Sequence, residues 1–300
     1  MAKGTCLLCK KTALIKNSHI IPSFVGKWLK NTSVTGYLRQ IVNPNLRKQD
    51  IATENLLCDL CELLLSKYED SFSKNIFYPY VNEELDEWGV AQGSIKEFEY
   101  KEWLLKFMVS VQWRSLITSK ELKNPQYIHF VQPVMNVLRE WEDFLLDRKG
   151  QSGHTKHYLI FLQNLVTGIG SLPPNINPRI NTYLIRSLDT TFACNKKNIF
   201  VFSKLGPIVL ISTIIPEKLD DMDDTSVKLQ GKIKTVQSLR NHMVNDFIFI
   251  TRPNECFERY NISDKQDKLI NDDIKRKIPK AKNLNSVLAS YSDFLMNKGK

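Results

Sequence analysis

The chain has 300 residues and a net charge of +10, with 42% hydrophobic and 25% charged residues. This composition is ordinary for a soluble globular protein, and the chain is long enough for one large domain or two smaller ones. The longest apolar run, residues 207–216, is bounded by prolines and is about half as long as a membrane-spanning helix, and no apolar segment follows the basic N-terminus. We therefore expect a cytoplasmic protein without a secretory signal or membrane segment.

The positive charge is concentrated near the N-terminus. Residues 1–61 carry nine basic and three acidic side chains, whereas residues 62–105 carry ten carboxylates and four lysines. Basic charge returns at residues 272–283. A basic N-terminal module suits binding to a phosphate backbone, and the alternative is a solvated basic surface without a partner.

Four of the six cysteines form two Cys-x-x-Cys pairs, at residues 6–9 and 58–61. Two intervening residues let one tight turn place both sulfurs on the same ion, and four thiolates suit tetrahedral Zn²⁺. In a reducing compartment this spacing favours a metal site over disulfides, although two unrelated pairs or a redox motif would share it. The predicted ligands of this structural zinc are Cys6, Cys9, Cys58 and Cys61. Cys194 and Cys256 are expected to be buried thiols.

The second cysteine pair precedes a predicted amphipathic helix, "ELLLSKYEDSF". Its apolar face carries Leu64, Leu65, Tyr68 and Phe72, and Glu62 and Glu69 lie on the opposite face.

Two further motifs lie between and around the cysteine pairs. "SHIIP" occupies residues 18–22, and "ENLLCDLCE" occupies residues 54–62. With "CLLC" at residues 6–9, their order resembles the HNH endonuclease family on its treble-clef ββα-metal fold, over about the first 75 residues. The resemblance implies a metal-dependent endonuclease that hydrolyses phosphodiester bonds of nucleic acid, with DNA favoured over RNA. It also suggests a bacterial or phage defence effector.

The resemblance implies a role for each matching residue. His19 matches the general base that activates a water, Asn55 the residue that orients this base, and Glu62 a ligand of the catalytic ion. A carboxylate ligand suits Mg²⁺ or Mn²⁺, which would stabilise charge on the phosphate. Glu69, two turns beyond Glu62, is an additional candidate ligand. The lysines expected to contact nucleic acid are Lys10, Lys11, Lys16, Lys27 and Lys30.

The chain departs from the family pattern at three positions. Ser18 stands where the family has a metal ligand before the base. Asn55 lies closer to its cysteine pair than the family spacing, and Glu62 replaces a histidine or asparagine.

The remaining chain predicts an α+β domain. A boundary is expected at residues 77–94, a helix at 95–117, and a second helix at 130–146 with Pro133 near its first turn. Short β-rich runs follow, with predicted strands at 156–165, 180–188, 198–204, 207–213 and 246–253 and a hairpin around Gly206. Two helices are expected to close the chain. The predicted organisation is a zinc module at 1–80 and a domain at 95–300, helical at 95–150 and sheet-rich at 156–253.

Three functions remain open at this point. The first is the endonuclease, with the C-terminal domain regulating it, binding a partner protein or forming a homodimer. In the second, the zinc module binds nucleic acid or a protein without cutting, which Ser18 favours. In the third, the C-terminal half carries the activity. The first requires a ring nitrogen of His19 and an oxygen of Glu62 to face one solvent-open groove.

Overall fold

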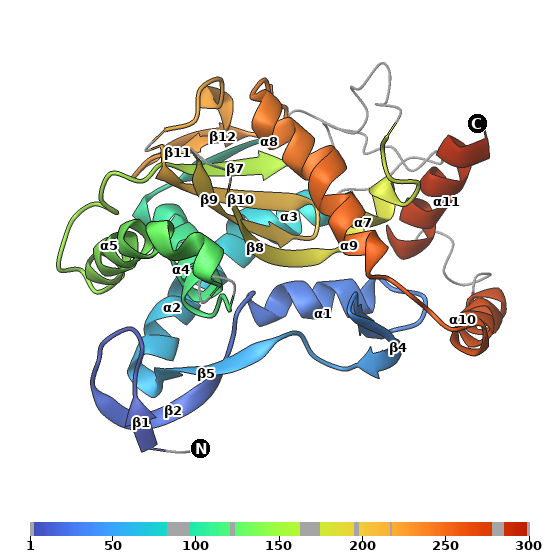
Figure 1. Cartoon of the computed structure of the whole chain (residues 1–300), viewed down its shortest axis with the longest axis horizontal. Coiled ribbons are helices and arrows are strands. Elements are labelled where there is room, and N and C mark those ends of the chain that lie inside the picture. The colour runs from blue at the N-terminus through green and yellow to red at the C-terminus, as the bar shows by residue number, and fades with distance from the viewer. Residues whose placement is uncertain are drawn as a thin grey trace.

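The computed structural model describes residues 3–82, 96–120, 124–162, 175–194, 198–216, 218–277 and 285–298 (Figure 1). It combines an N-terminal module of strands and helices with a five-stranded antiparallel sheet covered by helices, so the predicted α+β class is confirmed. Most of the predicted boundary, residues 83–94, lies outside the described residues. Among the described helices, none has the length and apolarity needed to cross a bilayer.

The N-terminal module is built on an antiparallel ribbon followed directly by a helix. Strands β1 (Lys3–Thr5), β2 (Thr12–His19) and β5 (Thr53–Cys58) pair in the order β1-β2-β5, and α2 (Asp59–Phe72) follows β5. Between β2 and β5 lie α1 (Ser23–Asn31), β3 (Leu38–Gln40) and β4 (Asn43–Lys48). A π-helical turn (Ser73–Phe77) continues α2 into α3 (Tyr78–Val81). The turn at residues 6–9, the ribbon of β1, β2 and β5, and helix α2 follow the chain order expected of a treble clef.

The central sheet has the strand order β11-β7-β10-β9-β8, with each neighbouring pair antiparallel. Its strands are β7 (His157–Phe161), β8 (Leu188–Cys194), β9 (Ile199–Leu205), β10 (Ile208–Ile215) and β11 (Ser226–Val227). Gly206 supplies the positive φ of +65° at the turn of the predicted β9–β10 hairpin. A second, two-stranded sheet pairs β6 (Glu97–Tyr100) with β12 (Gly231–Lys234).

Helices cover both faces of the central sheet, which explains its continuous apolar strands. On one face pack α4 (Glu102–Ile117) and α5 (Ile128–Leu145), and on the other α7 (Ile180–Arg186), α8 (His242–Asp246) and α9 (Arg252–Glu258). Helices α10 (Asp264–Lys277) and α11 (Asn285–Lys298) follow, as predicted. The core on the α4 face extends from Leu8 and Trp28 of the zinc module to Leu210 of the sheet. The two predicted domains therefore share one hydrophobic core.

Four local predictions were wrong. Residues 180–188 were expected to form a strand, but α7 forms because the Asp293 carboxylate accepts the backbone N–H groups of Asn181 and Thr182 at 2.8 and 3.0 Å. Residues 246–253 are helical, through α8, a π-turn (Phe247–Thr251) and α9, rather than a strand. The predicted helix at 95–117 begins only at Glu102, since β6 pairs with β12. Pro133 lies in the second turn of α5, which begins at Ile128.

Candidate functional site

The predicted zinc ligands come together at the start of the ribbon. The Sγ atoms of Cys6, Cys9, Cys58 and Cys61 all lie within 4.8 Å of one another. The distance between the Sγ atoms of Cys9 and Cys58 is 3.8 Å. Four thiolates bound to Zn²⁺ at ~2.3 Å stand about 3.8 Å apart at tetrahedral angles. The cluster is therefore compatible with a zinc site.

Local backbone geometry delivers these sulfurs in pairs. The first pair lies in a tight turn, in which the N–H of Lys10 donates to the Cys6 carbonyl at 2.9 Å and Lys10 has a φ of +63°. The second pair begins α2, with Cys58 preceding its first residue. Strand β5 pairs with β2 from Cys58 back to Thr53, which brings the two halves of the cluster together.

The pKa values of the cysteine thiols shift in different directions. Burial acts to raise the pKa of Cys6, but backbone N–H groups of Cys9, Cys58 and Leu8 outweigh it and lower this pKa to about 7. Burial and the charge of Cys6 raise the pKa of Cys61. A divalent cation would allow all four to be thiolates, because its charge compensates theirs.

His19 ends β2, and its ring is held by a carboxylate that the sequence did not predict. Nε2 of His19 lies 3.0 Å from Oδ2 of Asp50, and the two side chains are 28% and 64% exposed. A carboxylate only accepts, so Nε2 carries the proton, and Nδ1 is the unprotonated nitrogen of the neutral ring. Slight burial acts to raise the pKa of Asp50, but the hydrogen bond from His19 and the N–H of Ile51 hold it below its usual value.

The backbone of His19 is held by α4. Nη1 of Arg114 donates to the His19 carbonyl at 2.9 Å, and Nη2 donates to Oε1 of Glu69 at 2.7 Å. Arg114 is 2% exposed, so this bridge is internal. The Glu69 carboxylate, an additional candidate for the catalytic ion, thus pairs with a buried guanidinium.

Glu62 lies against Ser18 rather than beside the His19 ring. The Ser18 hydroxyl donates to Oε1 of Glu62, and Ser18 is 2% exposed. Successive side chains of a strand point to opposite faces, so Ser18 and Glu62 lie on the α2 side of β2 while His19 and Asp50 lie on the other. Among the described residues, Glu62 therefore hydrogen-bonds to Ser18, and the His19 ring hydrogen-bonds to Asp50.

Asn55 shares a face with His19. In the regular part of the β2–β5 register, Asn17 pairs with Asn55 and His19 with Thr53. Diagonal neighbours of this kind stand about 7–8 Å apart, and Asn55 is exposed. The orienting hydrogen bond to the ring comes instead from Asp50. A charged residue within the apolar stripe of α4 was a signal for Arg114, whereas nothing in the sequence distinguished Asp50.

The predicted nucleic-acid lysines divide into engaged and free groups. Lys10 pairs with Glu142 at 2.7 Å, Lys16 pairs with Asp59 at 2.9 Å, and Lys30 donates to the Gln49 carbonyl at 2.6 Å. Lys11 and Lys27 are exposed and form no ion pair with any described residue. Three of the five predicted lysines thus already have partners within the chain.

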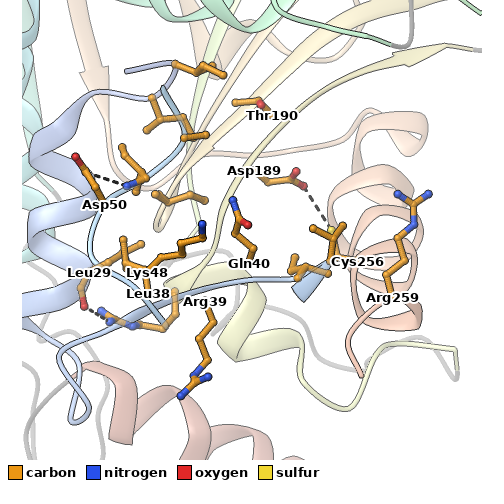
Figure 2. Close-up of a pocket in the computed structure, with 18 of the residues that line it drawn as sticks. Leu29, Leu38, Arg39, Gln40, Lys48, Asp50, Asp189, Thr190, Cys256 and Arg259 are labelled. Carbon is orange, nitrogen blue, oxygen red and sulfur yellow. Dashed lines mark hydrogen bonds between the residues drawn. The ribbon is translucent and has the colours of Figure 1, made fainter. Parts of the chain in front are cut away.

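A cavity of about 580 Å³ begins beside the His19–Asp50 pair. Asp50, Ile20 and Ile21 line it from the zinc module, and residues of β8 and α9 line it from the larger part. Figure 2 shows Lys48 and Gln40 pointing into this cavity, with Asp189 and Cys256 on the facing wall. Asp50, which hydrogen-bonds to the predicted base His19, therefore also lines a cavity between the zinc module and the larger part of the chain.

No protein-family model, curated protein or solved structure matches this chain. Its function is therefore inferred from its own residues and their geometry.

Proposed function

We propose that the chain is a metal-dependent endonuclease of the HNH type, acting on DNA. The observation that carries the proposal is the His19–Asp50 pair, in which a partly exposed imidazole is oriented by a carboxylate at 3.0 Å. A zinc module that serves only as a scaffold does not need such a pair. The matching order of the cysteine pairs and "SHIIP" supports the same function.

In the proposed reaction, Nδ1 of His19 takes a proton from a water whose oxygen attacks the scissile phosphorus. The P–O3′ bond breaks, and the 3′ oxygen leaves and is protonated by solvent. Asp50 keeps the proton on Nε2 and stabilises the imidazolium that forms, as a carboxylate does beside other catalytic histidines. Arg114 and Glu69 fix the strand end that carries the base. Asn55, on the same face, would contact the substrate.

Glu62 is the residue that would hold a catalytic Mg²⁺ or Mn²⁺. Such an ion supplies charge stabilisation on the phosphate, and Mg²⁺ commonly takes one or two protein carboxylates with water and substrate oxygens as its other ligands. The donor set here is a single carboxylate that Ser18 already engages. Binding of the ion to Oε1 requires this hydroxyl to turn away.

The test is cleavage of supercoiled plasmid and of single-stranded DNA with Mg²⁺, Mn²⁺ or Ni²⁺. Wild type is compared with His19→Ala, Asp50→Asn and Glu62→Gln, and with Lys228→Ala as a surface control. We expect His19→Ala to lose about 10²–10⁴-fold in rate, the usual contribution of a general base. Asp50→Asn should lose at least tenfold, and Glu62→Gln should raise the metal concentration required. Equal cleavage by wild type and His19→Ala would refute the assignment.

A second function, a zinc module that binds nucleic acid without cutting it, is favoured by the two engaged carboxylates. Ser18 holds Glu62 and Arg114 holds Glu69, which leaves neither of the predicted carboxylate ligands free of a partner. It predicts salt-dependent binding of labelled DNA by wild type and His19→Ala alike, with no cleavage by either. Lys11→Glu with Lys27→Glu should weaken that binding.

A further inference from the structure

The cavity beside Asp50 has the size and walls of a small-molecule site. Its volume of about 580 Å³ lies within the range of about 300–1,000 Å³ typical of ligand pockets. One wall comes from β3, β4 and the segment after His19, and the other from β8, α7 and α9. The site therefore exists only when the zinc module and the larger part are packed together.

Basic side chains outnumber acidic ones in the lining of this cavity. Five basic and three acidic side chains line it: Arg39, Lys48, Arg186, Arg252 and Arg259, with Asp50, Asp189 and Glu255. Arg252 alone neutralises two of the acids, at 2.7 Å from Asp189 and 2.9 Å from Glu255. Asp50 is engaged by His19.

Lys48 and Arg186 both line the cavity, and neither has a carboxylate partner among the described residues. Lys48 extends into the cavity in Figure 2, whereas Arg39 points away from its centre. Arg186 is anchored by neutral acceptors, the Leu29 carbonyl at 2.6 Å and the Thr32 hydroxyl, and its guanidinium stacks 5.2 Å from the Trp28 ring. An arginine anchored in this way retains its charge and further N–H donors for a ligand.

The rest of the lining is apolar. Ile20, Ile21, Leu38, Ile41 and Leu188 contribute hydrocarbon surface, and Gln40 and Thr190 add neutral hydrogen-bonding groups. A ligand that matches this surface has an anionic end for Lys48 and Arg186 and a flat, weakly polar body. A nucleotide combines these features, because its phosphates accept charge-assisted hydrogen bonds and its base packs on apolar walls.

We propose that this cavity binds a phosphate-bearing ligand of nucleotide size, with Lys48 and Arg186 as its phosphate contacts. The proposal does not depend on nuclease activity, since it concerns binding to groups that the proposed reaction does not use. Its ligand is either a free nucleotide or a phosphate of a nucleic-acid chain. Because Asp50 lines the same cavity, an occupant would sit beside the carboxylate that orients His19.

The test measures binding to the full-length, zinc-loaded protein by calorimetry and by the shift in thermal unfolding midpoint. The probes are ATP, inorganic tripolyphosphate, adenosine and a single-stranded oligodeoxynucleotide. We expect ATP and tripolyphosphate to bind and adenosine to bind far more weakly. Lys48→Ala should weaken the binding of ATP and of tripolyphosphate by about tenfold or more, as the loss of one charged hydrogen bond implies. Lys48→Glu should abolish binding, and Lys228→Ala, which alters an exposed lysine outside the cavity, should leave it unchanged.

The outcomes separate the two sources of phosphate. ATP binding that depends on Lys48 and is not displaced by the oligonucleotide assigns a free nucleotide. Oligonucleotide binding that depends on Lys48 and is much tighter than ATP binding assigns a nucleic-acid phosphate. The proposal is overturned if no phosphate probe binds in millimolar amounts, or if the binding is the same in wild type and Lys48→Glu.

Discussion

The bridge from Arg114 to Glu69 makes the first prediction, because it ties the strand end that carries His19 to the helix α4. Arg114 donates to the Ser110 carbonyl at 3.2 Å, to the His19 carbonyl at 2.9 Å and to the Glu69 carboxylate at 2.7 Å. The two side chains are 2% and 19% exposed. Replacing Arg114 by Met would leave a mostly desolvated carboxylate and an unpaired carbonyl.

Breaking a buried ion pair from one side costs about 3–5 kcal/mol, since the remaining charge stays buried without a partner. Water can reach Glu69 in part, so we expect Arg114→Met to lower the free energy of unfolding by about 2–4 kcal/mol. Glu69→Gln keeps an acceptor for Nη2 and should cost about 1–2 kcal/mol. The combination of Arg114→Met with Glu69→Leu should recover part of the loss, because neither partner then leaves a buried charge.

The assay is urea unfolding at neutral pH, followed by circular dichroism with zinc present throughout. Asp70→Asn, next to Glu69 on α2, provides the matched control, because its partner Lys74 is exposed and such pairs contribute little to stability. Strictly additive effects in the double variant, or a loss below about 0.5 kcal/mol in Arg114→Met, would show that the bridge does not hold the strand end.

Three further predictions concern other parts of the chain. Burial lowers the pKa of His157 to about 3, whereas an unfolded histidine titrates near ~6.5. The unfolded chain therefore binds one proton more between these values, and stability should fall by about 1.4 kcal/mol per pH unit on acidification below pH ~6.5. His157→Gln, whose amide can still bond to Ser212, should flatten this slope in acid-unfolding curves, and an unchanged slope would contradict the assignment. Cys61→Ser should bind less zinc than wild type, as measured by atomic emission. Zinc retained at full stoichiometry would contradict the four-cysteine site. Gly206→Ala should destabilise by about 2 kcal/mol in thermal unfolding, because its φ is +65° and the new Cβ would lie 2.8 Å from Trp28; a neutral effect would mean that the hairpin can shift.

Local sequence patterns were sufficient where the interacting groups are close in the chain or carry a strong chemical signature. The two Cys-x-x-Cys pairs predicted a four-cysteine cluster, and their spacing limits the geometry of each pair. The hairpin at Gly206 followed from a glycine between two apolar runs. The helix after Cys58 followed from its apolar periodicity.

Local patterns failed where a distant residue decides the structure. Residues 180–188 were predicted to be a strand from their β-rich composition, but the Asp293 carboxylate from the last helix accepts the N–H groups at the start of α7. The run at 247–250 is β-rich in composition, yet Phe247 packs against Phe200 and Phe202 from a helical backbone. Tertiary packing outweighs a propensity of a few tenths of a kcal/mol per residue.

The same division holds for the candidate site. The residue types at positions 6–9, 19 and 58–62 suggested the proposed chemistry from the sequence alone, because metal binding and base catalysis need particular side chains. The partners of those residues depended on the fold: Asp50 reaches the His19 ring, Arg114 reaches its carbonyl across 95 positions, and Ser18 engages Glu62. The cavity likewise joins α1, β4, β8 and α9. Contacts of this kind form only when the apolar surfaces of distant segments have been buried together, so no local pattern records them.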